Sequence, residues 1–231
     1  MASFEIPFVK VCGVTREEDL VSLEQCSVNS VGINLVSTSP RCIEIDAAKE
    51  FCLKAAELDL YSVVVLRNPE DALLKTVAEE LRPDAIQLHG SERPERLSDC
   101  GDCGVIKALS WSGRDEELKL AEAWCTYMQI NAGSREQFRA FLVDAYAPIE
   151  GGGTGKQARW DLLQPRPEIF SEFPLILAGG LNPNTVYDGI LETCCDGVDT
   201  ASGVELEPGV KSEILMQQFG LAANHGFARK W

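Results

Sequence analysis

The chain has 231 residues, 45% of them hydrophobic and 25% charged, and these proportions are typical of a globular protein that can bury one large core. The formal net charge of −15 argues against a nucleic-acid partner, because a polyanion is repelled where no basic stripe offsets the field. No apolar stretch is long enough to span a bilayer, and the N-terminal residues lack the features of a signal peptide. We therefore expect a soluble, cytoplasmic protein without a nucleic-acid or membrane partner.

Hydrophobic periodicity predicts strands and helices in alternation along the whole chain. The predicted strands are residues 8–12, 31–36, 61–66, 85–89, 105–109, 140–144, 174–178 and 197–200. The predicted helices are residues 16–25, 45–58, 70–81, 94–97, 115–124, 184–191 and 212–223, with one more starting at 160. Residues 125–136 show no clear period. The chain therefore reads as a series of β/α units.

Eight β/α units without a Pro-, Gly- or Ser-rich linker predict a single-domain (β/α)₈ TIM barrel that covers residues 1–231. The alternative is an open doubly wound sheet, which would need fewer strands or two halves. In a barrel of this kind the chemistry lies at the C-terminal ends of the strands. Here most of those ends are polar: Cys12, Asn34, Arg67, His89, Lys107, Asp144, Gly179 and Asp199.

Two glycine-rich segments follow predicted strands and suit an anion. They are GGGTGK at residues 151–156 and AGGLNP at residues 178–183. Glycine lets backbone N–H groups converge on phosphate oxygens with no Cβ in the way. The alternative for each segment is a tight turn with no ligand. Together they predict a phosphorylated small-molecule substrate.

Nine scattered cysteines do not form the even framework of a secreted disulfide protein. Cys100 and Cys103 have the spacing of a zinc knuckle, but the chain has no second pair of this spacing and only two histidines, His89 and His225. We therefore expect free, mainly structural cysteines and neither a metal nor a cofactor.

Several motifs, in order, resemble those of phosphoribosylanthranilate isomerase. They are KVCGVT (10–15), SPR (39–41), RNP (67–69), IQLHG (86–90), GGTGK (152–156), LAGGLNP (177–183), GVD (197–199) and SGVE (202–205). The resemblance covers residues 9–211. It implies a TIM barrel of the tryptophan pathway that carries out an Amadori rearrangement of N-(5-phosphoribosyl)anthranilate to 1-(2-carboxyphenylamino)-1-deoxyribulose 5-phosphate, without metal or cofactor.

The resemblance implies a catalytic role for two residues at the barrel mouth. Opening the furanose needs an acid at the ring oxygen, and the resulting iminium must lose its C2 proton to a base. The resemblance makes Asp144 the acid and Cys12 the base. A thiolate is a feasible base, because nearby positive charge lowers a thiol pKa. The alternatives are that Cys12 is one more core cysteine and that Asp144 caps the following loop.

Further residues are expected to hold the substrate. The resemblance assigns Arg41 to the anthranilate carboxylate, which a guanidinium can bind through two hydrogen bonds. The candidates at the phosphate are Gly179, Gly180, Asp199, Ser202 and Gly203, chiefly through backbone N–H groups. Lys156, with Gly153 and Gly155, lies in the glycine-rich loop after the sixth strand and is expected to help close it. His89 and Lys107 are expected to face the mouth, where each either touches the substrate or bonds to neighbouring loops.

Some positions depart from the family pattern, among them Asn34, Cys42, Ala158 and Ala201. They leave open a paralogous barrel isomerase or a non-catalytic binder, either acting on another phosphorylated aminosugar. A histidine-pathway isomerase would use paired aspartates on strands one and five, whereas the first strand here ends in Cys12. The sequence is compatible with a monomer or a homodimer.

Overall fold

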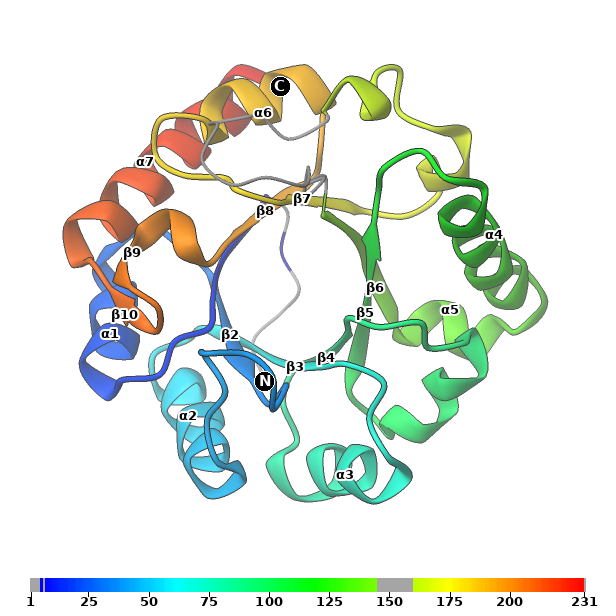
Figure 1. Ribbon diagram of the computed structural model, residues 1–231, viewed down its shortest axis with the longest axis horizontal. Helices are drawn as coiled ribbons and strands as arrows, with labels where there is room; N and C mark the ends of the chain where they lie inside the picture. The colour runs from blue at the N-terminus through cyan, green and yellow to red at the C-terminus, as the bar shows by residue number, and fades with distance from the viewer. Residues whose placement is uncertain (1–4, 6, 145–159, 231) are drawn as a thin grey trace.

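Eight parallel strands close into a barrel, and the helices form a ring around it (Figure 1). The computed structural model describes residues 5, 7–144 and 160–230. Each strand pairs with its neighbours in sequence, and the first and last strands close the ring. The strands are β1 (Phe8–Cys12), β2 (Ser30–Asn34), β3 (Tyr61–Leu66), β4 (Ala85–Leu88), β5 (Gly104–Ser110), β6 (Phe138–Asp144), β7 (Leu175–Ala178) and β8 (Gly197–Thr200). The predicted (β/α)₈ barrel is confirmed, and the open doubly wound sheet is wrong.

Helical segments connect the strands on the outside of the barrel. The α-helices are α1 (Glu17–Ser22), α2 (Ile45–Glu57), α3 (Asp71–Thr76), α4 (Asp115–Ile130), α5 (Ala132–Gln137), α6 (Val186–Thr193) and α7 (Glu213–Lys230). Shorter helical turns are η1 (Leu23–Gln25), η2 (Val77–Leu81), η3 (Pro94–Cys100), η4 (Trp160–Leu163), η5 (Glu168–Phe170) and η6 (Ser202–Val204). A hairpin of β9 (Glu205–Glu207) and β10 (Val210–Lys211) follows β8 and brings two charged residues, Glu205 and Lys211, toward the end of β1.

Side chains along each strand point alternately into the barrel and toward the helices, because successive residues of a strand face opposite sides. The inner apolar cluster includes Phe8, Tyr61, Ile106, Ala108 and Leu142. A larger cluster between strands and helices includes Trp124, Phe141 and Phe219. On β1 this alternation places Lys10 and Cys12 on the inner face with Phe8, which determines the chemistry of the mouth.

Two helices are longer than the sequence pattern predicts. Helix α4 extends to Ile130, because Cys125 and Met128 are buried and continue its apolar face. Helix α7 extends to Lys230 rather than ending at residue 223. Its glycines weaken the helical signal in the sequence, but Gly220 is needed for close packing, since a Cβ there would lie 1.8 Å from the carbonyl oxygen of Cys26. Tertiary packing, rather than propensity, determines both helix ends.

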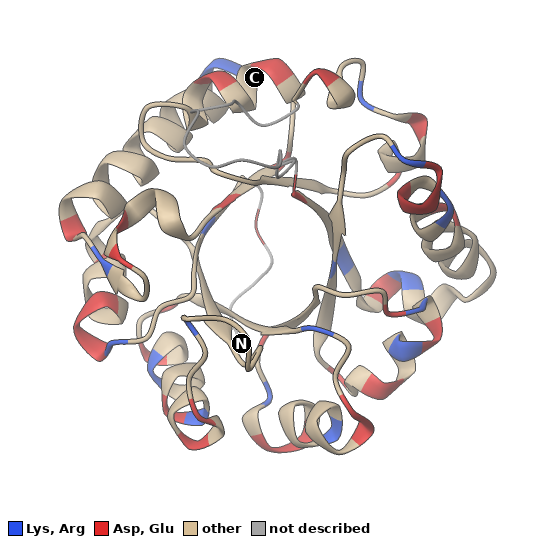
Figure 2. Ribbon diagram, in the orientation of Figure 1, with Lys and Arg blue, Asp and Glu red and all other residues tan. Residues whose placement is uncertain are grey.

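Charged residues of both signs are spread around the outer ring of helices and loops (Figure 2). In the described part of the chain, no helix has both the length and the apolar character needed to cross a bilayer.

Candidate active site

The carboxyl ends of the strands surround a cavity of about 400 Å³, which we call the central pocket. Its lining comes from strands β1 to β4 and β6 to β8 and from the loops after them. The lining residues are Cys12, Asn34, Arg41, Val65, Gln87, His89, Asp144, Ala178, Gly179, Gly180, Leu181, Asp199, Thr200, Ala201 and Ser202. The structure thus brings together eight of the residues predicted from the sequence: Cys12, Arg41, His89, Asp144, Gly179, Gly180, Asp199 and Ser202.

Cys12 ends β1 and is 8% exposed at the floor of the central pocket. Gly32 on the neighbouring strand β2 leaves room for the thiol, since a Cβ at that position would lie 2.6 Å from the Cys12 sulfur. Lys211 donates a hydrogen bond from Nζ to the Cys12 carbonyl oxygen at 2.7 Å. Two residues distant in sequence therefore fix where this sulfur lies.

Lys10 lies on the same inner face of β1 as Cys12, two residues earlier, and is fully buried. Its Nζ donates to Asp199 Oδ1 at 3.0 Å and to Gln87 Oε1 at 3.1 Å. Sequence reasoning missed Lys10 and Gln87 as members of the site. The two-residue periodicity of β1 and β4 was the signal that could have found them, because it places Lys10 with Cys12 and Gln87 with His89.

The charges around Cys12 have opposing effects on its thiol. Burial raises the pKa of Cys12, and the Lys10 ammonium reduces this rise without reversing it. Burial also lowers the pKa of Lys10, but Asp199 and Cys12 outweigh burial, so the pKa of Lys10 lies above its ordinary value. Cys12 is therefore predominantly a thiol at neutral pH, with a charged ammonium close to it.

Arg41 reaches the central pocket with one edge of its guanidinium already held. Its Nε and Nη2 donate to the two carboxylate oxygens of Glu205 at 2.7 and 2.6 Å. Lys211 donates to the same carboxylate at 2.7 Å. Burial raises the pKa of Glu205, but the hydrogen bonds from Arg41 and Lys211 outweigh burial and hold the pKa below its ordinary value. Among the described residues, Arg41 Nη1 has no hydrogen-bond partner.

The loops after β7 and β8 meet at the rim of the pocket. Gly179 and Gly180 have φ angles of 95° and 70°, in the left-handed region that favours glycine. At Gly203 a Cβ would lie 1.9 Å from the carbonyl oxygen of Leu181, so the two loops approach as closely as only glycine allows. Thr200 links them further, because its Oγ1 donates to that carbonyl at 2.6 Å. Backbone amides of the two loops can therefore converge on one anion.

The side chain of Asp199 has a role other than the expected phosphate contact. Its side chain, buried inside the barrel, accepts the hydrogen bond from Lys10. A carboxylate repels a phosphate, so any contact of Asp199 with that group falls to its backbone. The side chain instead supports the ammonium next to Cys12.

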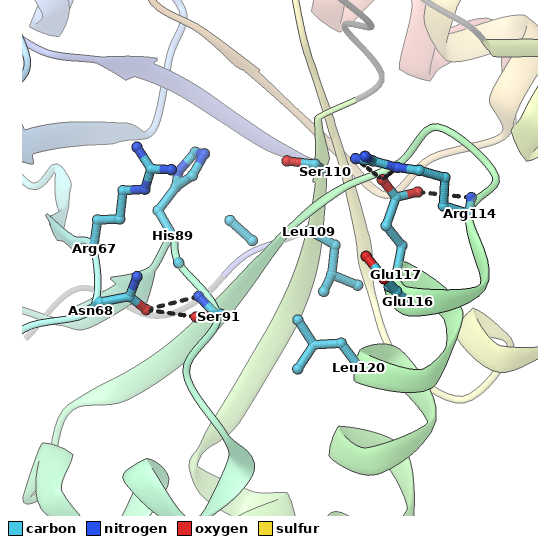
Figure 3. A pocket seen from close by; sticks show the side chains of 12 residues that line it. Arg67, Asn68, His89, Ser91, Leu109, Ser110, Arg114, Glu116, Glu117 and Leu120 are labelled. Carbon is cyan, nitrogen blue, oxygen red and sulfur yellow. Dashed lines mark hydrogen bonds and ion pairs between the residues drawn. The ribbon is translucent and has the colours of Figure 1, made fainter.

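His89 follows β4 and lines both the central pocket and a second pocket of about 460 Å³ at the ends of β3 to β5 (Figure 3). Gln87 Nε2 and His89 Nδ1 lie 2.8 Å apart. Burial and the positive charge of Lys10 lower the pKa of His89 to about 4. His89 is therefore uncharged at neutral pH.

Lys107 does not face the barrel mouth, and the expectation that it does is wrong. Ile106 and Ala108 occupy the inner face of β5, so the residue between them points toward the helices. There Lys107 Nζ donates to Glu92 Oε2 at 2.7 Å and to two backbone carbonyls. This ion pair belongs to the packing of the loop after β4.

Three of the predicted binding residues, Gly153, Gly155 and Lys156, lie outside the described residues. Cys100 and Cys103 are buried and free, as expected for structural cysteines. Within the ranges 7–144 and 160–230, no group of three or more His, Cys, Asp or Glu side chains is placed to hold a metal ion. The absence of a metal or cofactor stays a prediction.

Comparison with known proteins identifies the family. The family model described as N-(5'-phosphoribosyl)anthranilate (PRA) isomerase matches residues 9–220. The chain belongs to this family. The family predicted from the sequence motifs is confirmed, and with it an isomerase of tryptophan biosynthesis.

Individual relatives agree with this result. The chain is 33% identical over 216 residues to N-(5'-phosphoribosyl)anthranilate isomerase of Stenotrophomonas maltophilia, covering 91% of this chain and 90% of the relative. The crystal structure of phosphoribosyl anthranilate isomerase from Thermotoga maritima matches with a TM-score of 0.78 and 30% identity, over 94% of this chain and 98% of the other. Another structure of the isomerase, in complex with reduced 1-(o-carboxyphenylamino)-1-deoxyribulose 5-phosphate, matches with a TM-score of 0.75 and 27% identity, over 94% and 98% of the two chains.

Proposed function

We propose that this enzyme converts N-(5'-phosphoribosyl)anthranilate to 1-(2-carboxyphenylamino)-1-deoxyribulose 5-phosphate, with Cys12 and Asp144 as its catalytic pair. One observation carries the proposal: a thiol and a carboxyl from β1 and β6 line one pocket, together with the guanidinium of Arg41 and the loops after β7 and β8. The reaction needs an acid, a base, a cation for a carboxylate and amides for a phosphate. The central pocket supplies all four.

The proton transfers balance within the proposed reaction. Asp144 gives its proton to the ring oxygen, the bond from that oxygen to C1 breaks, and the anthranilate nitrogen forms an iminium with C1. Cys12, as thiolate, then takes the C2 proton, and the electrons of that C–H bond form the C1–C2 double bond of an enaminol. The enaminol becomes the ketone as its C2 hydroxyl loses a proton and C1 gains one. One proton has then passed from Asp144 to Cys12, and exchange with solvent water restores both groups. An isomerisation of this kind needs no oxidant or reductant, so side chains that transfer protons are sufficient.

Lys10 gives the thiolate of Cys12 a counter-charge. Burial disfavours an ionised sulfur, and an ammonium two residues away on the same inner face of β1 offsets part of this cost. Asp199 and Gln87 hold that ammonium in place. Only a minor fraction of Cys12 is thiolate in the free enzyme, but this thiolate lies next to the substrate C2 proton that it removes.

Substrate binding divides between two sides of the pocket. The free Nη1 edge of Arg41 binds the anthranilate carboxylate, while Glu205 holds the rest of the guanidinium. The amides of Gly179, Gly180, Ser202 and Gly203, with the backbone of Asp199, bind the phosphate. His89 contributes a hydrogen bond from the pocket wall, and Gly153, Gly155 and Lys156 stay proposed substrate-binding residues.

The alternatives are an isomerase of a different phosphorylated aminosugar and a protein that only binds one. Expression in a tryptophan-requiring host that lacks this isomerase separates them, because growth without tryptophan requires turnover of this substrate. The Cys12→Ser and Asp144→Asn variants are the controls and should not support growth. Failure of the wild-type chain to restore growth, despite soluble expression, would favour the alternatives.

A second assay addresses the cofactor. The purified enzyme, dialysed against a chelator, should keep its turnover of N-(5'-phosphoribosyl)anthranilate. Loss of turnover that a divalent ion restores would contradict the metal-free reaction.

We further propose that residues 1–231 form one cytoplasmic domain, active as a monomer or homodimer, without nucleic-acid or membrane partners.

A further inference from the structure

Gln87 lies between a buried ammonium and the ring of His89. Its side chain is on the inner face of β4 and the residue is 1% exposed. Lys10 Nζ lies 3.1 Å from Gln87 Oε1, and Gln87 Nε2 lies 2.8 Å from His89 Nδ1. These three residues form a continuous hydrogen-bonded chain from β1 to the pocket wall.

The chemistry of the three groups determines the direction of every hydrogen bond in this chain. An ammonium has donors only, so the amide atom of Gln87 that faces Lys10 must be its oxygen. The amide NH₂ then faces His89, and an NH₂ also only donates. His89 Nδ1 must therefore accept, which leaves the ring proton on Nε2. This nitrogen is on the side of the ring away from Gln87.

The charges around His89 keep its ring neutral. Lys10 on β1, Lys107 on β5 and Arg67 after β3 all oppose a positive charge on the ring, and Glu92 favours it. Burial acts in the same direction as the three cations, and the pKa falls to about 4. A neutral imidazole with a fixed Nε2–H is neither a strong acid nor an available base; it is an uncharged hydrogen-bond donor.

We propose that Gln87, oriented by Lys10, is a positioning residue that fixes His89 as a neutral Nε2–H donor in the central pocket. The Nε2–H group donates a hydrogen bond to the ring oxygen of the substrate as that oxygen gains negative charge during ring opening, and His89 itself takes no part in the proton transfers of Cys12 and Asp144. This part of the proposal rests on the proposed function. The tautomer itself does not, because it follows from the contacts of the free enzyme.

The protein suits a direct measurement of the His89 tautomer, since His89 and His225 are its only histidines. Two-dimensional ¹H–¹⁵N spectra of ¹⁵N-histidine-labelled enzyme distinguish protonated from unprotonated ring nitrogens, and the His225→Gln variant assigns the signals. His225 is on the exposed face of α7. We expect His89 to show a single Nε2–H tautomer at neutral pH and to become protonated only near pH 4. An Nδ1–H tautomer or an averaged mixture in the wild-type enzyme would overturn the proposal.

Two substitutions at position 87 test what holds the tautomer. In Gln87→Glu a carboxylate replaces the amide, so Nδ1 must carry a proton; we expect the tautomer to reverse or an imidazolium to form, with the titration midpoint raised by about one pH unit or more. In Gln87→Met no hydrogen bond is left, and we expect a mixture of tautomers. If one variant does not fold, the other still decides the question. A wild-type His89 pattern in a folded variant would overturn the proposal.

Kinetics then test whether the tautomer matters for catalysis. We expect Gln87→Glu to lower kcat at least about tenfold, with a smaller change in KM, because a donor aimed at developing charge acts on the transition state. Gln129→Glu adds the same charge at an exposed position of α4 and should leave kcat unchanged. A reversed tautomer with unchanged kcat would overturn the positioning role. Absence of any activity in the wild-type enzyme would instead refute the proposed function, while the tautomer measurement would still stand.

Discussion

The carboxylate of Glu205 binds the guanidinium of Arg41 through two hydrogen bonds, from Nε at 2.7 Å and from Nη2 at 2.6 Å. A side chain from the hairpin after β8 thus holds a side chain from the loop after β2. Arg41 is therefore not free to turn both nitrogens of this edge toward a substrate. Only its outer edge, which includes Nη1, is available to an anthranilate carboxylate.

Replacing Arg41 by Ala should weaken substrate binding by roughly 2–4 kcal/mol, because a charge-assisted contact is lost and a carboxylate is left unpaired. Binding of the substrate and of an analogue without the carboxylate can be compared by titration calorimetry. The loss should nearly vanish for the analogue. Equal losses for both ligands would mean that Arg41 supports only the fold.

The variants Cys12→Ser and Asp144→Asn should bind substrate nearly as the wild type does, yet turn it over at least about 100-fold more slowly. A hydroxyl does not ionise near neutral pH and an amide cannot donate the required proton, and positioned proton transfer supplies at least this factor. Steady-state kinetics and circular dichroism test activity and folding together. Near-full turnover by Cys12→Ser would place the base elsewhere.

The pH profile of kcat/KM should be flat through neutrality and fall on the alkaline side. In the active form Asp144 is protonated and Cys12 is ionised, so the pair carries one proton. The fraction of the enzyme in this form is constant between the pKa values of the two groups. A carboxyl ordinarily titrates far below a thiol, so the alkaline limb reports Cys12, whose pKa burial raises.

Replacing Lys10 by Met tests how its ammonium affects the pKa of Cys12. Loss of the ammonium raises the pKa of Cys12 further, so the alkaline limb should move up while the plateau drops, by about tenfold for each pH unit of the shift. A plateau that drops without any movement of the limb would show that Lys10 acts through packing alone.

Gly203→Ala should abolish most of the phosphate affinity. A Cβ at this position would lie 1.9 Å from the backbone oxygen of Leu181, so the loops after β7 and β8 must separate. Gly133→Ala is the matched control, because a Cβ there meets nothing within 4 Å. Competition by inorganic phosphate measures the effect. Equal phosphate inhibition in the two variants would place the phosphate elsewhere.

Glu92→Gln should lower the free energy of unfolding by about 3–5 kcal/mol near neutral pH, since it leaves the buried Lys107 ammonium without its counter-ion. The pKa of Glu92 in the folded protein is below its ordinary value: burial raises it, but Lys107 outweighs burial. The stability from this pair is therefore present above about pH 4.3, the unfolded value, and is lost as pH falls through the folded value. Urea denaturation at several pH values tests this, and the gap between wild type and variant should narrow in acid.

The sequence was sufficient for the barrel and for much of the site. Strands buried on both faces give short apolar runs such as YSVVVL at Tyr61–Leu66, and their regular spacing predicts the closed parallel sheet. The resemblance carried by the motifs also made Cys12, Asp144 and Arg41 candidates for the site, and all three line the central pocket. These signals are local, so one sequence without a structure can carry them.

Other features depend on contacts between distant segments. Lys10 meets Asp199 across 189 positions of the chain, and Lys211 reaches the Cys12 carbonyl across 199. Periodicity gives the face of a strand on which a side chain lies, but closure of the barrel decides which partner it meets. Lys107 was expected at the barrel mouth, but the alternation of side chains along β5 places it toward the helices, where it pairs with Glu92. Local patterns in the chain therefore predict the fold and the catalytic candidates, whereas the partners, protonation states and hydrogen-bond directions of those candidates depend on distances through space that only the folded barrel sets.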